Sequence, residues 1–595
     1  MKIGTSLLKI VTTATLLGLG LSTGATGLSQ VHGNVPSTVS QAKMTGHHNP
    51  RAKLNISIAL KLNNSGQLDA FLHSLHDRSS PNYHKYLTQA QFAAAYGPTA
   101  DQVQSVVGFL TSHGISVTAV SKSGTRVHAT ATTATLESAF GVAINDYKLN
   151  GTTFYATTSD PNLPANVAAN VVAVLGLDNA VSLVAHNVQN LHPAPTPKGK
   201  GAGPSGFSPL QVATAYDWPD ITSANSTAAS GVTIAVATAF TYRVQDIQKF
   251  WSTYNLPAHS LSNVAIDGVT RELNVETTLD IERSSSMSPG SAIKVYEAVN
   301  PGFITFDDEF TQIADDADVD VVTTSWGSAE GGGNPAPSSI VSEHQSFQQM
   351  TAEGITIMAA AGDDGSADRA SGTDNADFPS SDPYVIAAGG TTLSLNSDNS
   401  IDTETAWKSV NGQGGTGGAD SKFFAEPDYQ LAATVTTFIG NGACDGNHTG
   451  DFPDDGSVVG DGCAGAGADS RQSSDMSMDA DPGTGMSLYY NGRWLEFGGT
   501  SFVAPELAGL FANVTAQYRT ALAGASEPNP SARLGSGPEL IYCVANANYA
   551  ATFHDITSGS NGMFSAVTGW DHPTGWGTPD GNAFIAVALG NCLPF

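Results

Sequence analysis

The sequence predicts an α/β protein in which a parallel sheet covered by helices follows a separate, smaller α+β domain. Three observations lead to this fold class. Strand and helix patterns alternate between residues 232 and 361, the composition changes between residues 186 and 206, and the residues before that change combine helices with a β-hairpin signal. Regular alternation is typical of parallel sheets, whereas a hairpin requires antiparallel strands. The two parts are therefore expected to fold as separate domains.

Composition and charge narrow the range of functions. The chain has 595 residues, of which 40% are hydrophobic and 13% are charged, as in a globular protein rather than a disordered one. The formal net charge of -29 at pH 7 argues against nucleic acid as a partner. An acidic habitat, in which carboxylates are protonated, and an ordinary acidic secreted protein account for this charge about equally well.

The first residues, 1–27, are typical of a secretory signal peptide. Lys2 and Lys9 precede an apolar segment over residues 10–21, and small residues follow this segment up to Gly27. No later segment of the sequence is apolar over a length that could span a membrane. We therefore expect a secreted, extracellular protein that makes no membrane contact.

Residues 45–185 are expected to form the α+β domain. The alternating run LNISIALKL, residues 54–62, predicts a strand, and Asn150-Gly151 between two strand-like runs predicts a hairpin. Helices are predicted over residues 67–76, 87–96, 101–113 and 133–140, and strands over residues 115–120, 126–130, 144–149 and 152–157. The position between a signal peptide and a linker indicates a propeptide; a permanent binding module is the alternative.

The segment over residues 186–206 is predicted to be an exposed, cleavable linker. It is rich in His, Pro, Lys and Gly and includes the stretch PAPTPKGKG, residues 193–201. A segment of this composition has little apolar surface to bury and is open to proteolysis.

Residues 207–595 are expected to form the larger domain. Strands are predicted over residues 232–237, 292–298, 319–325 and 355–361, and helices over residues 245–254, 275–284, 306–317 and 340–353. In a parallel sheet the functional groups lie at the carboxyl ends of the strands. The glycine-rich stretches 412–418 and 441–469 are expected to be surface loops.

Ser501 lies in a context that suits a nucleophile. It follows Gly498, Gly499 and Thr500, and it precedes an apolar run over residues 502–514 that predicts a helix beginning at or just after Ser501. The free N–H groups and the dipole at a helix N-terminus stabilise the negative charge that develops on an attacked carbonyl. A simple capping role is the alternative.

The base for such a serine is expected to be a carboxylate. The histidines of the larger domain lie outside any glycine-rich, helix-opening context; they are His259, His344, His448, His554 and His572. Glu276 and Asp280 are spaced i, i+4 and so share one face of the predicted helix, where they would share a proton and serve as a base under acidic conditions. A solvated acidic helix face is the alternative.

Asp363 directly follows the predicted strand over residues 355–361 and Gly362. At the carboxyl end of that strand, a protonated carboxyl group could donate a hydrogen bond to the oxyanion of a tetrahedral intermediate. A functionless Asp-Asp-Gly turn is the alternative.

Together these stretches resemble the sedolisin family of serine-carboxyl peptidases, in the form of a kumamolisin-like precursor with an activation domain. By this resemblance, Glu276 is the general base, Asp280 the acid that orients it, Asp363 the oxyanion donor and Ser501 the nucleophile. The resemblance implies a subtilisin-like fold for residues 207–595 and an activation prodomain of ferredoxin-like α+β fold for residues 45–185. Ser325-Trp326-Gly327 resembles the edge segment along which the family binds its peptide substrate.

The resemblance also implies one Ca2+ site near the C-terminus. Its ligands would be the side chains of Asp555 and Asp571 and the carbonyls of Ile556, Val567 and Gly569. Position 567 often carries Gly in the family, but a carbonyl ligand tolerates Val. The four cysteines allow three disulfide connectivities, of which Cys444–Cys463 with Cys543–Cys592 is the local pairing.

The expected function is that of a secreted, acid-active serine-carboxyl endopeptidase. Its prodomain would inhibit the precursor until autoprocessing, its substrates would be proteins or peptides, and it would act as a monomer. A tripeptidyl-peptidase of the same family and a non-catalytic calcium-binding surface protein on the same scaffold are the alternatives.

Overall fold

The computed structural model describes residues 27–189, 204–221, 226–331, 336–369, 374–408, 414–431, 470–523, 529 and 531–594. The predicted signal peptide, except Gly27, lies outside these residues. So do the predicted loop 441–469, the cysteines Cys444 and Cys463, and most of the predicted linker.

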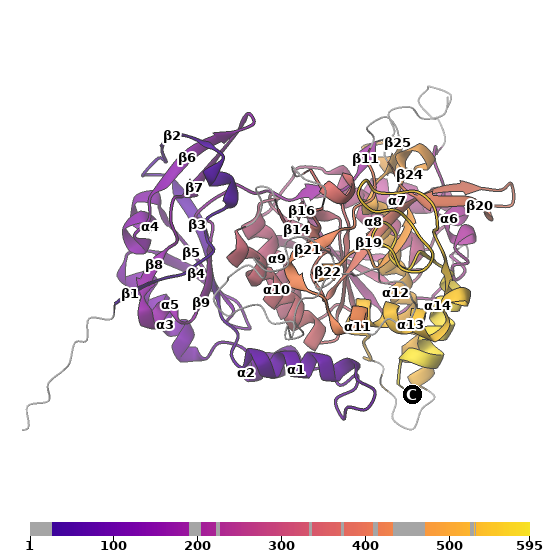
Figure 1. The fold of residues 1–595 in the computed structure, drawn as a ribbon, viewed down its shortest axis with the longest axis horizontal. Coiled ribbons are helices and arrows are strands. Elements are labelled where there is room, and N and C mark those ends of the chain that lie inside the picture. The colour runs from indigo at the N-terminus through magenta and orange to yellow at the C-terminus, as the bar shows by residue number, and fades with distance from the viewer. Residues whose placement is uncertain are drawn as a thin grey trace, which may run out of the picture.

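The smaller domain lies beside the larger one and sends its helices α1 and α2 beneath it (Figure 1). Its four-stranded antiparallel sheet has the order β4-β5-β3-β9, which is 2-3-1-4 when these strands are counted along the chain. This is the ferredoxin-like arrangement, as predicted. The elements of this domain are, in chain order, β1 (Leu28–Gln30), β2 (Lys43–His47), β3 (Lys53–Leu60), α1 (Ser65–His76), α2 (Gln89–Ala95), α3 (Ala100–Ser112), β4 (Ser116–Val120), β5 (Arg126–Thr132), α4 (Thr133–Phe140), β6 (Ile144–Leu149), β7 (Thr152–Thr157), β8 (Asn162–Pro164), α5 (Ala165–Ala168) and β9 (Val171–Leu175).

Alternation along β3 gives the sheet of the smaller domain two different faces. Leu54, Ile56 and Ile58 point into its core, whereas Ser57 and Ala59 point to the larger domain, where they meet α9 and its N-terminal end. The predicted hairpin is also present, because Asn150 and Gly151 have φ of 50° and 92°, as the tight turn between β6 and β7 requires.

The larger domain is built on an eight-stranded sheet of order β13-β14-β12-β15-β17-β19-β20, with β23 paired to β19. All strands are parallel except β20, so the predicted subtilisin-like sheet is confirmed. The main elements are, in chain order, α6 (Pro209–Ala215), β12 (Thr233–Ala239), α7 (Val244–Tyr254), β13 (Ser260–Ile266), α8 (Val275–Met287), β14 (Ala292–Ala298), α9 (Phe303–Asp316), β15 (Val321–Thr324), β16 (Trp326–Ala329), α10 (Pro337–Ala352), β17 (Thr356–Ala360), β18 (Asp377–Phe378), β19 (Val385–Leu395), β20 (Ile401–Ala406), β21 (Asp420–Ala425), α11 (Asp428–Leu431), β22 (Ser470–Gln472), β23 (Met476–Asp479), β24 (Met486–Tyr490), β25 (Arg493–Gly498), α12 (Thr500–Ala523), α13 (Gly537–Thr552), β26 (Phe553–His554), β27 (Thr578–Pro579) and α14 (Gly581–Val587).

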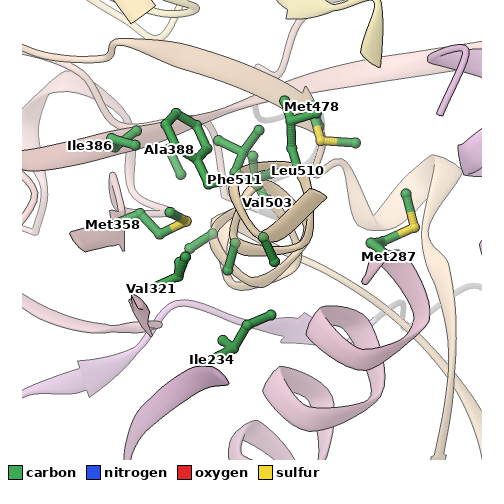
Figure 2. Close-up of a cluster of buried hydrophobic side chains, with 14 of the residues drawn as sticks. Ile234, Met287, Val321, Met358, Ile386, Ala388, Met478, Val503, Leu510 and Phe511 are labelled. Atoms are coloured by element: carbon green, nitrogen blue, oxygen red, sulfur yellow. The ribbon is translucent and has the colours of Figure 1, made fainter. Parts of the chain in front are cut away.

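Helix α12 runs through the centre of the main hydrophobic core (Figure 2). Val503, Leu510 and Phe511 of this helix lie among side chains from the sheet, such as Met358 and Ile386. On the other face of the sheet, α9 and α10 cover a second core and separate the sheet from the smaller domain. The sheet is therefore covered on both faces, as its continuous apolar strands require.

Three glycines of the predicted loop 412–418 are not on the surface, where they had been expected. Gly415, Gly417 and Gly418 are buried, and a Cβ on Gly417 would lie 2.6 Å from the carbonyl carbon of Ala361. This stretch therefore packs against the end of β17, and glycine is required by the close approach of two backbones.

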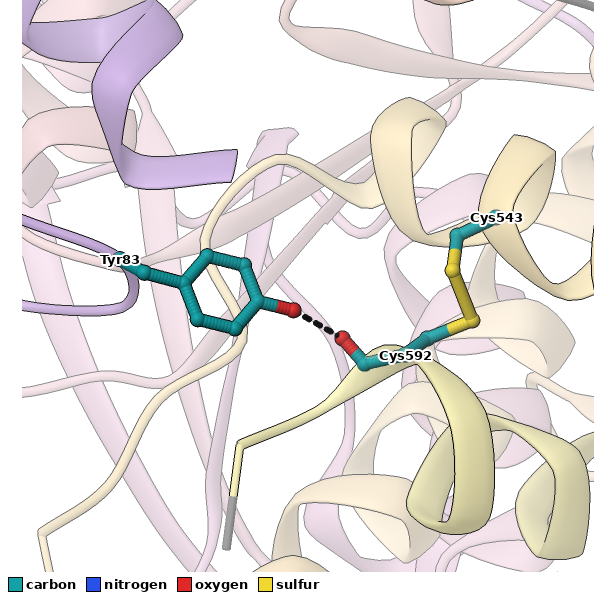
Figure 3. Close-up of a disulfide and its surroundings, with 3 residues drawn as sticks. All are labelled: Tyr83, Cys543 and Cys592. Carbon is teal, nitrogen blue, oxygen red and sulfur yellow. Dashed lines mark hydrogen bonds between the residues drawn. A yellow bond between two sulfur atoms is a disulfide. The ribbon is translucent and has the colours of Figure 1, made fainter. Parts of the chain in front are cut away.

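The predicted disulfide between Cys543 and Cys592 is present and ties α13 to the C-terminal turn (Figure 3). Tyr83 of the smaller domain donates a hydrogen bond of 2.6 Å to the carbonyl of Cys592. Within the described residues, no helix combines the length and the apolar character that crossing a membrane requires.

Candidate active site

Glu276 and Asp280 lie on the first two turns of α8, and Asn274 directly precedes this helix. The Asn274 side chain accepts a hydrogen bond of 2.7 Å from the backbone N–H of Glu276 and so caps the helix. Both carboxyl groups are fully buried, so a solvated acidic face is excluded. The N-terminal end of α8 therefore brings two acids into the interior of the protein.

The two carboxyl groups behave as a pair that holds a proton. Burial raises the pKa of Glu276 to about 7, although hydrogen bonding by Asn187 and Ser501 opposes this rise. Burial and the charge of Glu276 raise the pKa of Asp280 well above its usual value, and Ser325 donates a hydrogen bond of 2.6 Å to Asp280. Asp280 is thus the partner that keeps its proton, and Glu276 is the group that can exchange one.

Ser501 is the second residue of α12, which begins one residue earlier than the sequence predicted, and its hydroxyl is buried. Buried contacts hold α12 against α8: the Arg283 guanidinium pairs with the Glu506 carboxylate, and a Cβ on Gly509 would lie 2.9 Å from the carbonyl carbon of Met287. Ser325 adds a further link, since its hydroxyl lies 3.3 Å from the carbonyl oxygen of Ser501. The positions of the serine and the acid pair are therefore fixed relative to each other.

Asp363 lies just beyond the carboxyl end of β17, as expected in a parallel sheet. Its Oδ1 accepts hydrogen bonds from the backbone N–H and the hydroxyl of Thr500, at 2.7 and 2.8 Å. Its Oδ2 has no hydrogen-bond partner within the described residues, and burial raises the pKa of this carboxyl group to about 7. Below that pH the free oxygen carries a proton that it can donate.

A segment of the smaller domain runs through this site. Strand β10 (Val184–Ala185) pairs with β16 in antiparallel fashion, with Val184 opposite Gly327. Strand β11 (Val188–Gln189) pairs with β25 in the same way. The predicted edge segment Ser325-Trp326-Gly327 therefore does bind an extended peptide, which comes from the same chain.

Between these strands, His186 and Asn187 contact the predicted catalytic groups. The N–H of Ser501 donates to the carbonyl oxygen of His186 at 2.9 Å, and the Asn187 side chain donates to Glu276. A Cβ on Gly499 would touch that same carbonyl oxygen and would lie 2.6 Å from Oδ2 of Asp363. Ser501, Glu276 and Asp363 thus lie around His186 and Asn187, and Asp280 lies behind Glu276 on the same helix.

The prediction of an exposed linker is wrong at its start, because His186 is fully buried. The composition of residues 186–206 did not reveal this, since His186 is buried by contacts with distant residues rather than by an apolar pattern. The sequence analysis also did not predict that Ser325 would hydrogen-bond Asp280 or that Thr500 would hydrogen-bond Asp363. The one available signal was that both are polar residues within or beside the motifs.

The predicted calcium ligands lie in one loop region after α13. Asp555 accepts a hydrogen bond of 3.0 Å from the N–H of Gly569, and Asp571 accepts one of 2.8 Å from the N–H of Val567. The carbonyls of Ile556, Val567 and Gly569 accept no hydrogen bond from the described residues. Within the described part of the chain there is no group of three or more His, Cys, Asp or Glu side chains that could hold a metal, so most of the ligands here would be carbonyls.

Comparisons with known proteins bear on both domains. The family model described as the pro-kumamolisin activation domain matches residues 40–180, and that of the subtilase family matches residues 269–532. Kumamolisin of Bacillus sp. (strain MN-32) is 27% identical over 93% of this chain and 94% of its own. Sedolisin of Pseudomonas sp. (strain 101) is 27% identical over 88% of this chain and 85% of its own.

A solved structure of Pseudomonas sedolisin, described as a serine-carboxyl proteinase, matches with a TM-score of 0.53 at 25% identity, and the match covers 66% of this chain and all of that one. The chain belongs to the sedolisin family. It is a sedolisin-type precursor, namely a serine-type peptidase preceded by an activation domain. The sedolisin relatives include tripeptidyl-peptidase 1 of Rattus norvegicus, which is 23% identical over 91% of this chain and 93% of its own.

Proposed function

We propose that the protein is a secreted, acid-active serine-carboxyl endopeptidase made as an inhibited precursor. The observation that supports this most strongly is the convergence of Ser501, Glu276 and Asp363 on two consecutive residues of the bound segment, His186 and Asn187. Export is supported by the N-terminal sequence over residues 1–27, which suits a signal peptide.

In the proposed mechanism, the Ser501 hydroxyl attacks the carbonyl carbon of the substrate while Glu276 accepts the hydroxyl proton. Asp280 keeps its own proton and stabilises the Glu276 carboxylate from the adjacent helical turn. The N–H of Ser501 and the protonated carboxyl group of Asp363 donate hydrogen bonds to the oxyanion. Each such donor contributes about a hundredfold to a thousandfold to kcat. Glu276 then returns the proton to the leaving amine, and water hydrolyses the acyl-enzyme.

The smaller domain is proposed to inhibit the enzyme within the same chain. Residues 184–189 fill the cleft between β16 and β25, and the sheet of the domain covers α9 and α10. Arg126 anchors this surface: its Nε donates to Asp307 at 2.7 Å, and both side chains are fully buried. A substrate cannot enter the cleft until this segment leaves it.

Acid is proposed to trigger removal of the smaller domain, a proposal that rests on the net charge of -29. The ionisable pairs at this surface do not supply the trigger. Burial raises the pKa of Asp307 despite its pairing with Arg126, and Asp308 raises the pKa of His128 although burial opposes this rise. A group whose pKa is raised in the docked state favours that state when it is protonated.

An endopeptidase is favoured over a tripeptidyl-peptidase by the length of the bound segment. On the amino-terminal side of the His186–Asn187 bond, contacts with the larger domain continue through Val184 and Leu183 to Ser182, which forms a bridge with Gly302. An enzyme that removes tripeptides must bind a free amino terminus three residues from the cut bond, whereas this cleft takes at least five. A non-catalytic binding protein is disfavoured because all four catalytic groups are present.

One calcium ion is proposed to bind the loop region after α13. Asp555 and Asp571 would supply two carboxylates, and Ile556, Val567 and Gly569 would supply carbonyls, a set of oxygen ligands that suits this hard cation. The ion would hold residues 555–571 in place, and no catalytic step depends on it.

The test is the mass of the purified precursor after incubation at about pH 4 and about pH 7, with and without Ser501→Ala; these values lie near and well above the ordinary carboxyl pKa. We expect loss of the N-terminal domain only in acid and only with Ser501 present. Processing of the alanine variant at the wild-type rate would show that Ser501 is not the nucleophile. Equal rates at both pH values would contradict the acid trigger.

A further inference from the structure

The chain that joins the two domains crosses the site in the orientation of a substrate. Of this segment, His186 is bound most completely: its N–H donates to the carbonyl of Ser325 at 3.0 Å, and its carbonyl accepts from the N–H of Ser501 at 2.9 Å. That N–H belongs to the residue that carries the nucleophilic hydroxyl, so the carbonyl of His186 is bound by the backbone of the nucleophile itself. The following Asn187 contacts the base Glu276.

The strand pairing on both sides keeps this register. Val184 lies opposite Gly327 on one side, and Val188 lies opposite Gly498 on the other. A shift by one residue would break both ladders and turn the side chain of His186 out of its pocket. The register therefore selects one peptide bond out of the segment.

The pocket of the His186 side chain is buried and acidic. Nε2 of His186 lies 3.1 Å from Oδ2 of Asp377, and both side chains are fully buried. Asp368 lies beside Asp377, and the two carboxyl groups interact. The pocket thus offers two carboxyl groups as hydrogen-bonding partners to whatever side chain enters it.

Gly327 keeps this pocket open. A Cβ at that position would lie 2.8 Å from Nε2 of His186 and would overlap the carboxylate of Asp377. A larger residue on this strand would close the route between the peptide backbone and the two acids. The pocket is therefore formed by the same strand that binds the peptide.

We propose that the bond between His186 and Asn187 is the first one that the enzyme cuts in its own chain, and that Asp377, with Asp368, makes histidine the preferred residue on the acyl side of a cut bond. This proposal rests on the proposed function and adds the processing site and the specificity of the cleft.

The reaction follows from the atoms that are in contact. Ser501 Oγ bonds to the carbonyl carbon of His186, and its proton passes to Glu276. The C–N bond to Asn187 breaks, and the amine of Asn187 takes the proton from Glu276. Water then hydrolyses the ester, which leaves His186 with a free carboxylate and Asn187 as a new amino terminus. Because both reactants lie in one chain, the first cut is unimolecular.

The first experiment follows the full-length precursor after a jump to about pH 4, with samples taken before half of it has reacted. Mass spectrometry should show a fragment that ends at His186 together with one that begins at Asn187, and the rate should stay constant over a hundredfold range of precursor concentration. A first cut elsewhere, for instance within residues 190–206, would overturn the proposal but leave the proposed function intact. Absence of any cut, together with no cleavage of an added protein substrate, would overturn the proposed function instead.

The second experiment tests the pocket with the mature enzyme. Two peptides with the sequence of residues 181–190 are compared, one with the natural His186 and one with leucine at that position. We expect kcat/KM to be at least tenfold higher for the histidine peptide, and this ratio to fall to about one in Asp377→Asn. The matched control is Asp398→Asn, which changes an exposed carboxylate between β19 and β20 and should keep the ratio. An unchanged ratio in Asp377→Asn, or no preference in the wild type, would refute the assignment of the pocket.

Discussion

Asp363 and Asp364 are neighbours in the sequence, but their carboxyl groups have opposite surroundings. Asp364 lies at the surface and pairs with Arg369, whereas Asp363 is 2% exposed and receives two hydrogen bonds from Thr500 on one oxygen only. That asymmetry leaves the second oxygen of Asp363 free to carry a proton. The same residue type thus serves as an ion-pair partner at one position and as a neutral donor at the next.

The pH dependence of kcat/KM should reveal the ionisation of Asp363, the proposed oxyanion donor. Burial raises the pKa of Asp363, which is protonated below that pKa and ionised above it, so kcat/KM of the mature enzyme should fall as the pH rises and Asp363 ionises. Asp363→Asn keeps an acceptor for Thr500 and supplies an N–H donor that does not titrate. We expect this variant to keep part of its activity and to lose the alkaline limb of its pH profile.

Asp363→Ala is the matched control, because it removes the donor altogether. It should lower kcat by about a hundredfold to a thousandfold at every pH. An alkaline limb that is unchanged in Asp363→Asn would assign that limb to another group and would contradict the oxyanion role.

The candidate residues of the site were predictable from local sequence, but their environment was not. The spacing of Glu276 and Asp280 and the position of Ser501 at a helix start are local features. His186 is different, because only the folded chain brings it to Asp377, far away in sequence. The composition of a linker is an average over the whole segment. It does not show that a single residue, such as His186, is buried by contact with a residue that is distant in the sequence.

Helix α8 explains why burial was hard to predict from pattern. The residues Glu276 to Met287 are all buried, although the helix contains Glu, Asp, Arg, Thr and Ser and shows no clear apolar stripe. Its polar groups are satisfied by partners on other elements, such as Ser325 and Glu506. Hydrophobic periodicity identifies helices that expose one face to solvent and bury the other. It is uninformative for a helix that is buried on all sides.

Strand β13 was missed for a related reason. Ser260–Ile266 is the exposed edge of the large sheet, and most of its side chains are outside the core. Strands β12, β14, β15 and β17 of the same sheet were predicted within two residues of their bounds, and β12 is a continuous apolar run. The buried strands β19 and β23 were not predicted.

The loop region after α13 should respond to calcium. Added calcium should raise the melting temperature of the Ser501→Ala precursor, and a chelator should lower it, because binding to the folded state adds about 3 kcal/mol when free calcium is a hundredfold above its Kd. Asp571→Asn should abolish this calcium-dependent increment. Calorimetry measures it independently of activity.

The comparison has to be made on the increment rather than on the absolute melting temperature, because Asp571 also accepts hydrogen bonds from Val567 and Thr574. Asp398→Asn serves as the control that should retain the full increment. A wild-type melting temperature that does not depend on calcium would argue against the site.

Across the molecule, several buried carboxyl groups have raised pKa values. Burial raises the pKa of Glu330 to about 7 and that of Glu353 to about 8, and it raises the pKa values of Glu343, Asp368 and Asp479 well above the usual range. A group whose pKa is higher in the folded state than in the unfolded state favours folding below the unfolded value. That contribution is lost as the pH rises through the folded value.

The free energy of unfolding should therefore decrease between about pH 5 and about pH 9. For Glu330 and Glu353 the loss is on the order of 3 to 5 kcal/mol each once both are ionised. Thermal unfolding of the Ser501→Ala precursor, which cannot cut itself, should show a melting temperature that falls steadily over this range. A melting temperature that rises with pH would mean that groups with lowered pKa values dominate.

Because residues 184–189 run through the cleft, cutting of the chain and activation of the enzyme should occur at different times. Breaking one covalent bond between β10 and β11 removes none of the hydrogen bonds that hold β10 on β16, and it leaves Arg126 paired with Asp307. The severed domain would then remain in place as a bound product whose new carboxyl terminus lies against Ser501. Activity should appear only after a lag that is set by dissociation of this product, so the time course of chain scission and the time course of enzyme activation should be distinct.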